Sequence, residues 1–177
     1  KIINKSSMLM LMISFLTILF SKEMVETLAD YRYRESISVV PIILIGNSLI
    51  HVYLSYVNFT FYKKKTILVS IGTLLAVTIN ISLNYLLIPK YGIHGAAWAT
   101  VVAYLMLAFF HYLIATKVLK SNPVSWILLL WYSAILLASY FLVVYLDSLT
   151  LWLSLFVKVI VCIFVLTITV KTRIHNE

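Results

Sequence analysis

Long apolar stretches separated by short polar segments run through the whole chain. A helix needs about 20 apolar residues to cross roughly 30 Å of hydrocarbon. Backbone polar groups inside lipid must be satisfied within their own segment, and the short alternating segments of a transmembrane barrel are missing, so we expect helices. The pattern predicts an all-α polytopic transmembrane bundle of about six spans: Ile2–Phe20, Pro41–Phe59, Ile67–Ile88, Gly95–Ala115, Val124–Leu146 and Leu149–Val170.

Helix-breaking residues mark two of the connections. Pro89-Lys90-Tyr91-Gly92 is a tight turn signal, which predicts an antiparallel hairpin of the third and fourth spans. Ser121-Asn122-Pro123 separates the fourth span from the fifth, and proline is acceptable in a first helical turn. The longest connection, Ser21–Glu35, has apolar residues at helical spacing and is expected to form a short amphipathic turn. The fourth span carries small residues that favour close helix packing: Gly95, Ala99 and Ala103.

The composition excludes a soluble domain. Of the 177 residues, 63% are hydrophobic and 11% are charged, and the mean hydropathy is +1.03. Globular proteins are about 45–50% apolar and about 25% charged. A single cysteine excludes a disulfide framework, and no P-loop, His-Glu-x-x-His or paired His/Cys motif occurs. We therefore expect no cofactor, no metal site and no catalytic residue.

The charges predict an orientation. With the N-terminus inside, the inner connections hold Lys1, Lys5, Lys63, Lys64, Lys65, Lys117, Lys120, Lys171 and Arg173, whereas the outer ones hold Lys22, Arg32, Arg34 and Lys90. The more basic set faces the cytoplasm by the positive-inside rule, so we expect both termini there. The net charge of +8 then reflects cytoplasmic connections and anionic membrane lipids as partners, with no nucleic acid. Because the chain opens on Lys1 rather than Met, we also expect a missing N-terminal part.

Polar residues within three successive spans recur at helical spacing. Inside lipid each of them needs a partner or a hydrated cavity. They are Asn47, His51, Ser55 and Asn58 in the second span, Thr73, Asn80 and Asn84 in the third, and Thr100, Tyr104 and His111 in the fourth. We expect the stripes to converge on one interior surface. The hydroxyl side chains are explained by hydrogen bonds to the backbone of their own helix. Two roles stay open for the candidate substrate-cavity residues, packing between helices or lining a hydrated cavity: Asn47, His51, Asn80 and Asn84.

Lys158 is the sharpest single signal, because a lysine within a span costs about 2.5–3.5 kcal/mol on insertion scales. None of the six spans contains an acid, and Asp147 is eleven residues away, about 16 Å along a continuous helix. We therefore expect no partner within direct reach in this chain. Snorkelling to the interface, a contact with a missing part of the protein, and a lipid phosphate are the alternatives for this intramembrane charge.

The segment from Asn80 to Thr100 resembles a known family. Its sequence, NISLNYLLIPKYGIHGAAWAT, is similar to the C-terminal signature of bacterial polysaccharide flippases, which export O-antigen and capsule units and share a superfamily with the lipid II flippase and MATE drug exporters. The matching positions Pro89, Gly92 and Gly95 are interpreted as structural residues of the hairpin. The resemblance implies a two-lobe transporter of 12–14 helices. Residues 1–120 would be the latter part of its C-terminal lobe, and residues 121–177 two terminal helices.

The resemblance also implies a function. Such a protein is not an enzyme, and it moves undecaprenyl-diphosphate-linked oligosaccharide across the bacterial plasma membrane, with polysaccharide assembly proteins among its partners. The alternatives are another transporter of the superfamily, for lipid II, teichoic precursors or small cations, and a small helical assembly subunit. A membrane glycan polymerase or ligase would instead use charged residues of the outer loop: Glu23, Glu26, Asp30, Arg32, Arg34 and Glu35.

Overall fold

The computed structural model describes residues 2–121 and 126–174, and every regular element of this part is a helix. The elements are α1 (Ile2–Leu19), α2 (Ser21–Leu28), the 3-10 helix η1 (Tyr31–Ser38), α3 (Val40–Tyr62), α4 (Thr66–Leu113), the π-helix η2 (Ile114–Val118), α5 (Trp126–Asp147) and α6 (Leu151–Ile174). Each of the six predicted apolar segments is therefore helical over its described residues, except at the boundary residues Phe20, Leu149 and Thr150. Parts of the prediction that lie outside the described residues are Lys1, the break at Asn122 and Pro123, Val124, and the side chains of Lys5, Lys171 and Arg173.

Three described helices are long and apolar enough to cross a membrane. They are Val40–Tyr62, Thr66–Val118 and Leu130–Asp147, and the second of these contains both predicted spans of the hairpin. Leu9–Leu19 and Trp152–Ile163 are shorter apolar helices. The protein is thus all-helical with membrane-length helices, as predicted, and the count of six crossings stays a prediction.

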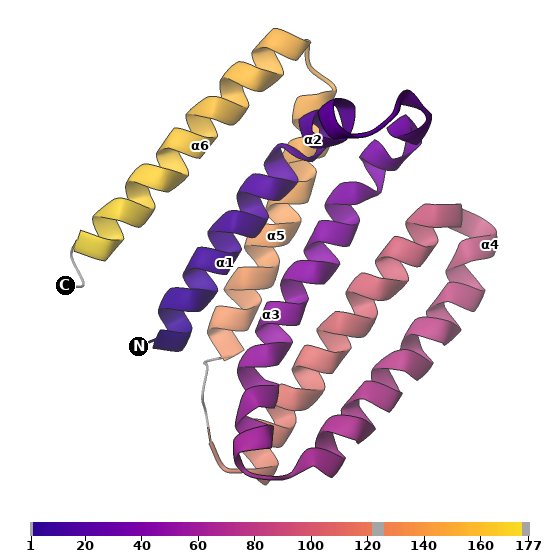
Figure 1. The fold of residues 1–177 in the computed structure, drawn as a ribbon, viewed down its shortest axis with the longest axis vertical. Coiled ribbons are helices and arrows are strands. Elements are labelled where there is room, and N and C mark those ends of the chain that lie inside the picture. Colours follow the sequence, from indigo (N-terminus) through magenta and orange to yellow (C-terminus); the bar gives the residue numbers. More distant parts are fainter. Residues whose placement is uncertain (1, 122–125, 175–177) are drawn as a thin grey trace.

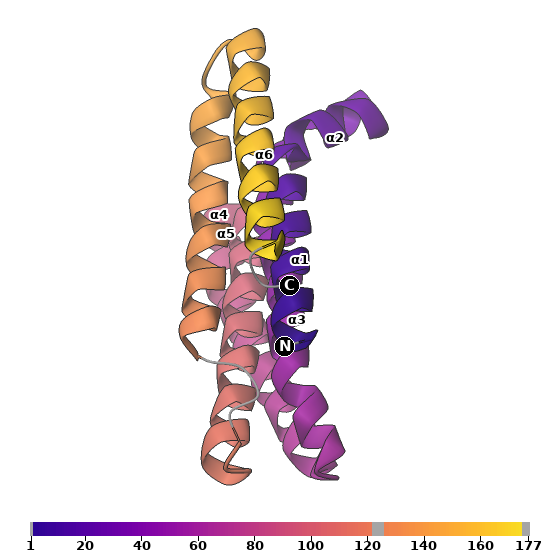
Figure 2. The same ribbon diagram turned by 90° about the vertical axis from the view of Figure 1, so that its left-hand side faces the viewer.

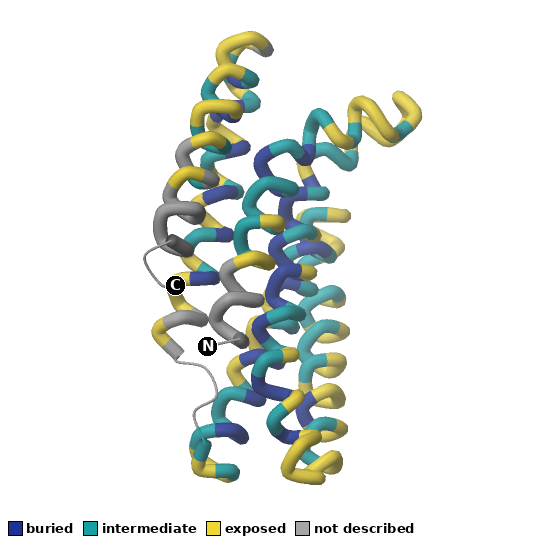
Figure 3. Tube along the Cα trace, turned by 60° about the vertical axis from the view of Figure 1, so that its left-hand side comes forward, coloured by how far each residue is buried: buried dark blue, intermediate teal, exposed yellow. Residues whose placement is uncertain are grey.

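α3 lies at the centre of the bundle. It packs against α1, α4 and α5, and its end contacts η2 (Figure 1). Ile42, Leu49 and Tyr56 of this helix are buried. Figure 3 shows buried positions recurring along the interior of the bundle. α6 packs more loosely, on α5 and α1 (Figure 2). The bundle therefore has its tightest packing between α3 and its neighbours.

The outward faces of the helices are apolar. Along the first half of α4, Ile67, Leu74 and Ile81 are each more than 60% exposed. Exposed apolar surface of this extent is unusual on a water-soluble monomer. It suits helices that face hydrocarbon or further protein.

The predicted amphipathic turn in Ser21–Glu35 is present as α2, which is followed by η1. Asp30 caps η1, because its Oδ1 accepts a hydrogen bond of 3.0 Å from the backbone N–H of Arg32. The Arg32 side chain folds onto the same carboxylate at 3.1 Å, with both groups largely exposed. An exposed pair of this kind contributes little to stability. The connection is thus a solvated one, with α2 lying at the end of the bundle where α5 ends (Figure 1).

Candidate functional site

α4 is a hairpin of two helical arms, residues 66–91 and residues 93–113. Gly92 reverses the chain with φ 56° and ψ −134°, the conformation of the first central residue in a type II′ turn. This region favours glycine, because a Cβ there would clash with the backbone. Pro89 lies in the last turn of the first arm. The hairpin predicted from Pro89 and Gly92 is therefore confirmed.

Two further glycines let the arms approach each other. A Cβ added to Gly95 would lie 2.5 Å from the backbone oxygen of Leu87. A Cβ at Gly72 would lie 2.7 Å from the Phe110 ring and 2.9 Å from Nε2 of His111. At Gly95 the obstacle is backbone, so glycine is required there, whereas at Gly72 a Cβ would displace the Phe110 and His111 side chains. The prediction of close packing at Gly95 is confirmed.

The hairpin holds a polar cluster between its arms. Nδ2 of Asn84 donates a hydrogen bond of 3.0 Å to Oδ1 of Asn80, and Nδ2 of Asn80 lies 3.5 Å from Oγ1 of Thr100. The Thr100 hydroxyl donates to the Ala96 carbonyl of its own helix at 3.1 Å. Oδ1 of Asn84 is buried and accepts no hydrogen bond among the described residues. A buried acceptor without a donor indicates a place for a water or a ligand hydroxyl.

The polar residues of α3 are not part of the cluster in the hairpin. The side chains of Asn47 and Asn58 are exposed, on the face that also carries Ile43 and Leu54. His51 is half-buried, and its Nε2 has no hydrogen-bond partner among the described residues. No hydrogen bond in this part of the chain joins Asn47 or His51 to the hairpin cluster. Of the residues in the three stripes, hydrogen bonds between side chains in the described part of the chain join only Asn80, Asn84 and Thr100, all in α4. Thr73 is exposed and bonds its own helix backbone.

His111 is fully buried where α3 meets both arms of the hairpin. Its ring lies 5.4 Å from that of Tyr53 on α3, between centroids, and it faces the space left by Gly72. Neither ring nitrogen has a hydrogen-bond partner among the described residues. This histidine thus packs as an aromatic ring.

Lys158 has two partners within the chain, so the expectation that it has none was wrong. Its Nζ donates to Oε1 and Oε2 of Glu23 at 2.8 and 3.1 Å and to Oδ1 of Asp147 at 3.2 Å. The lysine side chain is fully buried, whereas the two carboxylates are 24% and 23% exposed. The error came from measuring the distance to Asp147 along one continuous helix. α5 ends at Asp147 and α6 begins at Leu151, so the chain turns back and Lys158 lies beside the end of α5.

The one signal for Glu23 in the sequence was its place in the outer connection, where the acids gather. Nothing in the spacing of Glu23 and Lys158 along the chain indicates their contact, because 135 residues separate them. Their pairing depends on how α2 and α6 pack on the rest of the bundle.

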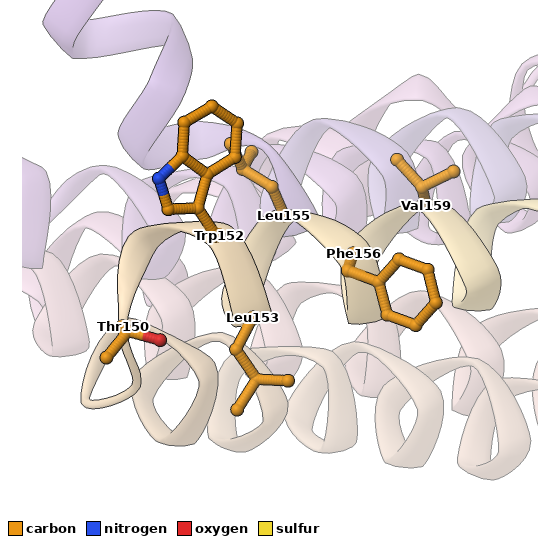
Figure 4. A pocket seen from close by; sticks show the side chains of 6 residues that line it. All are labelled: Thr150, Trp152, Leu153, Leu155, Phe156 and Val159. Atoms are coloured by element: carbon orange, nitrogen blue, oxygen red, sulfur yellow. The ribbon is translucent and has the colours of Figure 1, made fainter.

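An open apolar depression of about 670 Å³ lies along α6, and no predicted site residue is part of its lining, although Lys158 is on the same helix. Its lining comes from one stretch of chain: Thr150, Trp152, Leu153, Leu155, Phe156 and Val159 (Figure 4). The polar side-chain groups in that lining are the Thr150 hydroxyl and the Trp152 indole N–H, and the rest is apolar. The depression therefore suits lipid chains better than a hydrophilic ligand. Among the described residues no cluster of three His, Cys, Asp or Glu side chains is placed to hold a metal ion.

Comparisons of the chain with protein-family models, with curated proteins and with solved structures found no match. The resemblance in the segment from Asn80 to Thr100 therefore stays a prediction.

Proposed function

We propose that the chain is part of a membrane transporter that flips undecaprenyl-diphosphate-linked oligosaccharide, an O-antigen or capsule repeat unit, across the bacterial plasma membrane. The observation that carries this proposal is the amide cluster of Asn80 and Asn84 in the hairpin. It leaves the buried Oδ1 of Asn84 free to accept a hydrogen bond. Sugar hydroxyls are donors that suit such an acceptor.

The open face of α3 supports a hydrated pathway. Asn47 and Asn58 are exposed on a helix of 23 residues that is otherwise apolar enough to span a membrane. Exposed amides are unfavourable against hydrocarbon, so polar residues in spans normally face protein or water. A water-lined cavity completed by another part of the transporter would satisfy both side chains. Substrate sites near the midplane between helices are typical of transporters.

The proposal includes a membrane orientation and a mechanism without covalent chemistry. The connections with the most lysines face the cytoplasm and α2 faces outward, following the positive-inside rule. The charged outer connection serves as a solvated loop rather than a catalytic one, because Arg32 is exposed and paired with its neighbour Asp30. Transport then proceeds by alternating access of the cavity.

Complementation of a deletion strain tests the proposal. Deleting the full gene should abolish surface polysaccharide and cause lipid-linked repeat units to accumulate, and the full gene should restore export. The paired change Asn80→Ala and Asn84→Ala should lower export roughly tenfold, the loss expected when about 1.4 kcal/mol of substrate hydrogen bonding disappears. Thr78→Ala is the matched control, because this exposed hydroxyl on the same arm bonds the backbone oxygen of Leu74.

Two results would contradict the proposal. One is normal surface polysaccharide, with no accumulated intermediate, in the deletion strain. The other is a cell-wall or drug-sensitivity defect in its place, which would assign the chain to another transporter of the same superfamily. Equal protein levels for all variants must be verified by immunoblotting.

A further inference from the structure

Five exposed lysines gather at one end of the bundle, in two connections far apart in sequence. We call this surface the lysine end: Lys63, Lys64, Lys65, Lys117 and Lys120. The connection between α3 and α4 and the helix η2 both lie at this end, opposite α2 (Figures 1 and 2). The end of α3 also contacts η2 directly. The topology thus combines two short basic segments into one surface.

The positive charge of the lysine end is not neutralised within the described residues. The described acids are in α2, η1, their connection and the end of α5, all at the opposite end of the bundle: Glu23, Glu26, Asp30, Glu35 and Asp147. The ion pairs of this part of the chain are those of Arg32 and Lys158. Five ammonium groups are therefore available to an external anion.

Two of these lysines occupy backbone positions that ordinarily favour glycine. Lys64 has φ 55° and Lys120 has φ 50°, each just beyond the end of a helix. Glycine or asparagine is the usual residue at such a left-handed position, because a Cβ is strained there. The helix dipole favours a cation near a C-terminus, but Lys63 and Lys117 already provide one with ordinary backbone angles. The placement of lysine at both strained positions indicates a use for the charge.

Aromatic side chains border the lysine end. Phe61 is 48% exposed and Tyr62 is 78% exposed, and Nζ of Lys63 lies 5.6 Å from the centre of the Phe59 ring. Aromatic rings at the end of an apolar helix are typical of the headgroup region of a membrane. Lysines beside them reach the level of the lipid phosphates.

We propose that the lysine end is a docking surface for anionic phospholipid. Its ammonium groups bind the headgroup phosphates of the membrane leaflet that this end faces. Five flexible ammonium groups spread over two connections match a layer of phosphates better than one bound phosphate. Each lysine near an anionic membrane surface raises binding roughly fivefold. The inference does not depend on the transported substrate, so it stands even if transport assays fail.

Lipid enrichment measures this directly. The full protein that contains the chain is reconstituted into nanodiscs of phosphatidylglycerol and phosphatidylcholine, and the retained lipids are counted by native mass spectrometry. Replacing the five lysines by glutamine should lower the enrichment of phosphatidylglycerol at least about threefold. The matched control replaces by glutamine four basic residues at the opposite end: Lys22, Arg32, Arg34 and Lys90. This variant should retain the enrichment of phosphatidylglycerol.

Three outcomes would overturn the inference. They are unchanged enrichment in the five-lysine variant, equal loss in the control, and displacement of the lipid by millimolar inorganic phosphate, which would indicate a site for free phosphate. If the five-lysine variant fails to fold, the Lys63/Lys64/Lys65 triple variant and the Lys117/Lys120 double variant replace it. Each of these must then lose part of the enrichment.

Discussion

Lys158 is a buried cation held by two carboxylates that are each about one quarter exposed. Removing an acid and removing the lysine are therefore unequal changes. Without both acids, the ammonium stays buried and unpaired, and breaking a buried pair in this way costs about 3–5 kcal/mol. Without the lysine, both carboxylates can still reach water, and the loss should be about 1–2 kcal/mol.

We therefore predict that the double variant Glu23→Gln, Asp147→Asn is less stable than Lys158→Met. Thermal unfolding in detergent, followed by size-exclusion chromatography, gives the comparison. The triple variant with all three changes should recover most of the stability. If Lys158→Met lowers the melting temperature as much as the double variant does, the prediction is contradicted. The carboxylates would then need the lysine as much as the lysine needs them.

At this scale the sequence predicted which residue matters but not what it touches. Lys158 stands out because a lysine in an apolar helix requires an explanation. Its partners do not stand out, because Glu23 and Asp147 lie in polar connections where acids are ordinary. The contact brings together the first turn of α2, the end of α5 and a position within α6, and no local pattern encodes that.

At the scale of the elements, the close approach of the two arms of α4 allows a prediction about stability. The Cβ of a Gly95→Ala variant would lie 2.5 Å from a backbone oxygen that cannot move without displacing the first arm. Such overpacking typically costs about 1–3 kcal/mol, and we expect the upper end of that range. The melting temperature of the purified protein in detergent measures the loss.

Gly46→Ala is the matched control for this change. Its Cβ would lie 3.6 Å from the Val101 side chain, which is an ordinary van der Waals contact. Alanine also favours the helix by roughly 0.5–1 kcal/mol over glycine, so the variant should be neutral or slightly more stable. If both variants have the same melting temperature, the close approach of the two arms at Gly95 does not contribute to stability.

The hairpin itself was predictable because its signals are local. Pro89 and Gly92 mark the reversal, and the small residues after it mark the packed face. The contact of Asn80 with Thr100 follows from that reversal, since it brings positions on either side of Gly92 together. The position of the α3 stripe does not follow, because it depends on the rotation of α3 about its own axis, which packing with α4, α1 and α5 determines.

At the scale of the whole molecule, the two ends of the bundle differ in charge, and this predicts opposite accessibility. In a Cys162→Ala background, Arg34→Cys should react with a membrane-impermeant maleimide in intact cells. Lys64→Cys should react only after the cells are permeabilised. Both native side chains are exposed, so a difference in labelling reports sidedness and not burial.

The reverse labelling pattern would invert the orientation, and labelling of both positions in intact cells would contradict a membrane between them. The alternation of the connections was predictable from hydropathy and charge. The order in which the helices pack, with α3 at the centre and α6 on the outside, was not, since several arrangements bury similar apolar faces.

The contact of Glu23 with Lys158 has a consequence for how the chain is made. The lysine is synthesised 135 residues after its main partner, and a helix that carries an unpaired lysine enters a membrane poorly. When α6 leaves the ribosome, α2 and α5 have already been delivered with their carboxylates in place. In the predicted six-span arrangement, stable insertion of α6 would therefore depend on the prior assembly of α2 and α5, and the contact would act as a checkpoint of biogenesis.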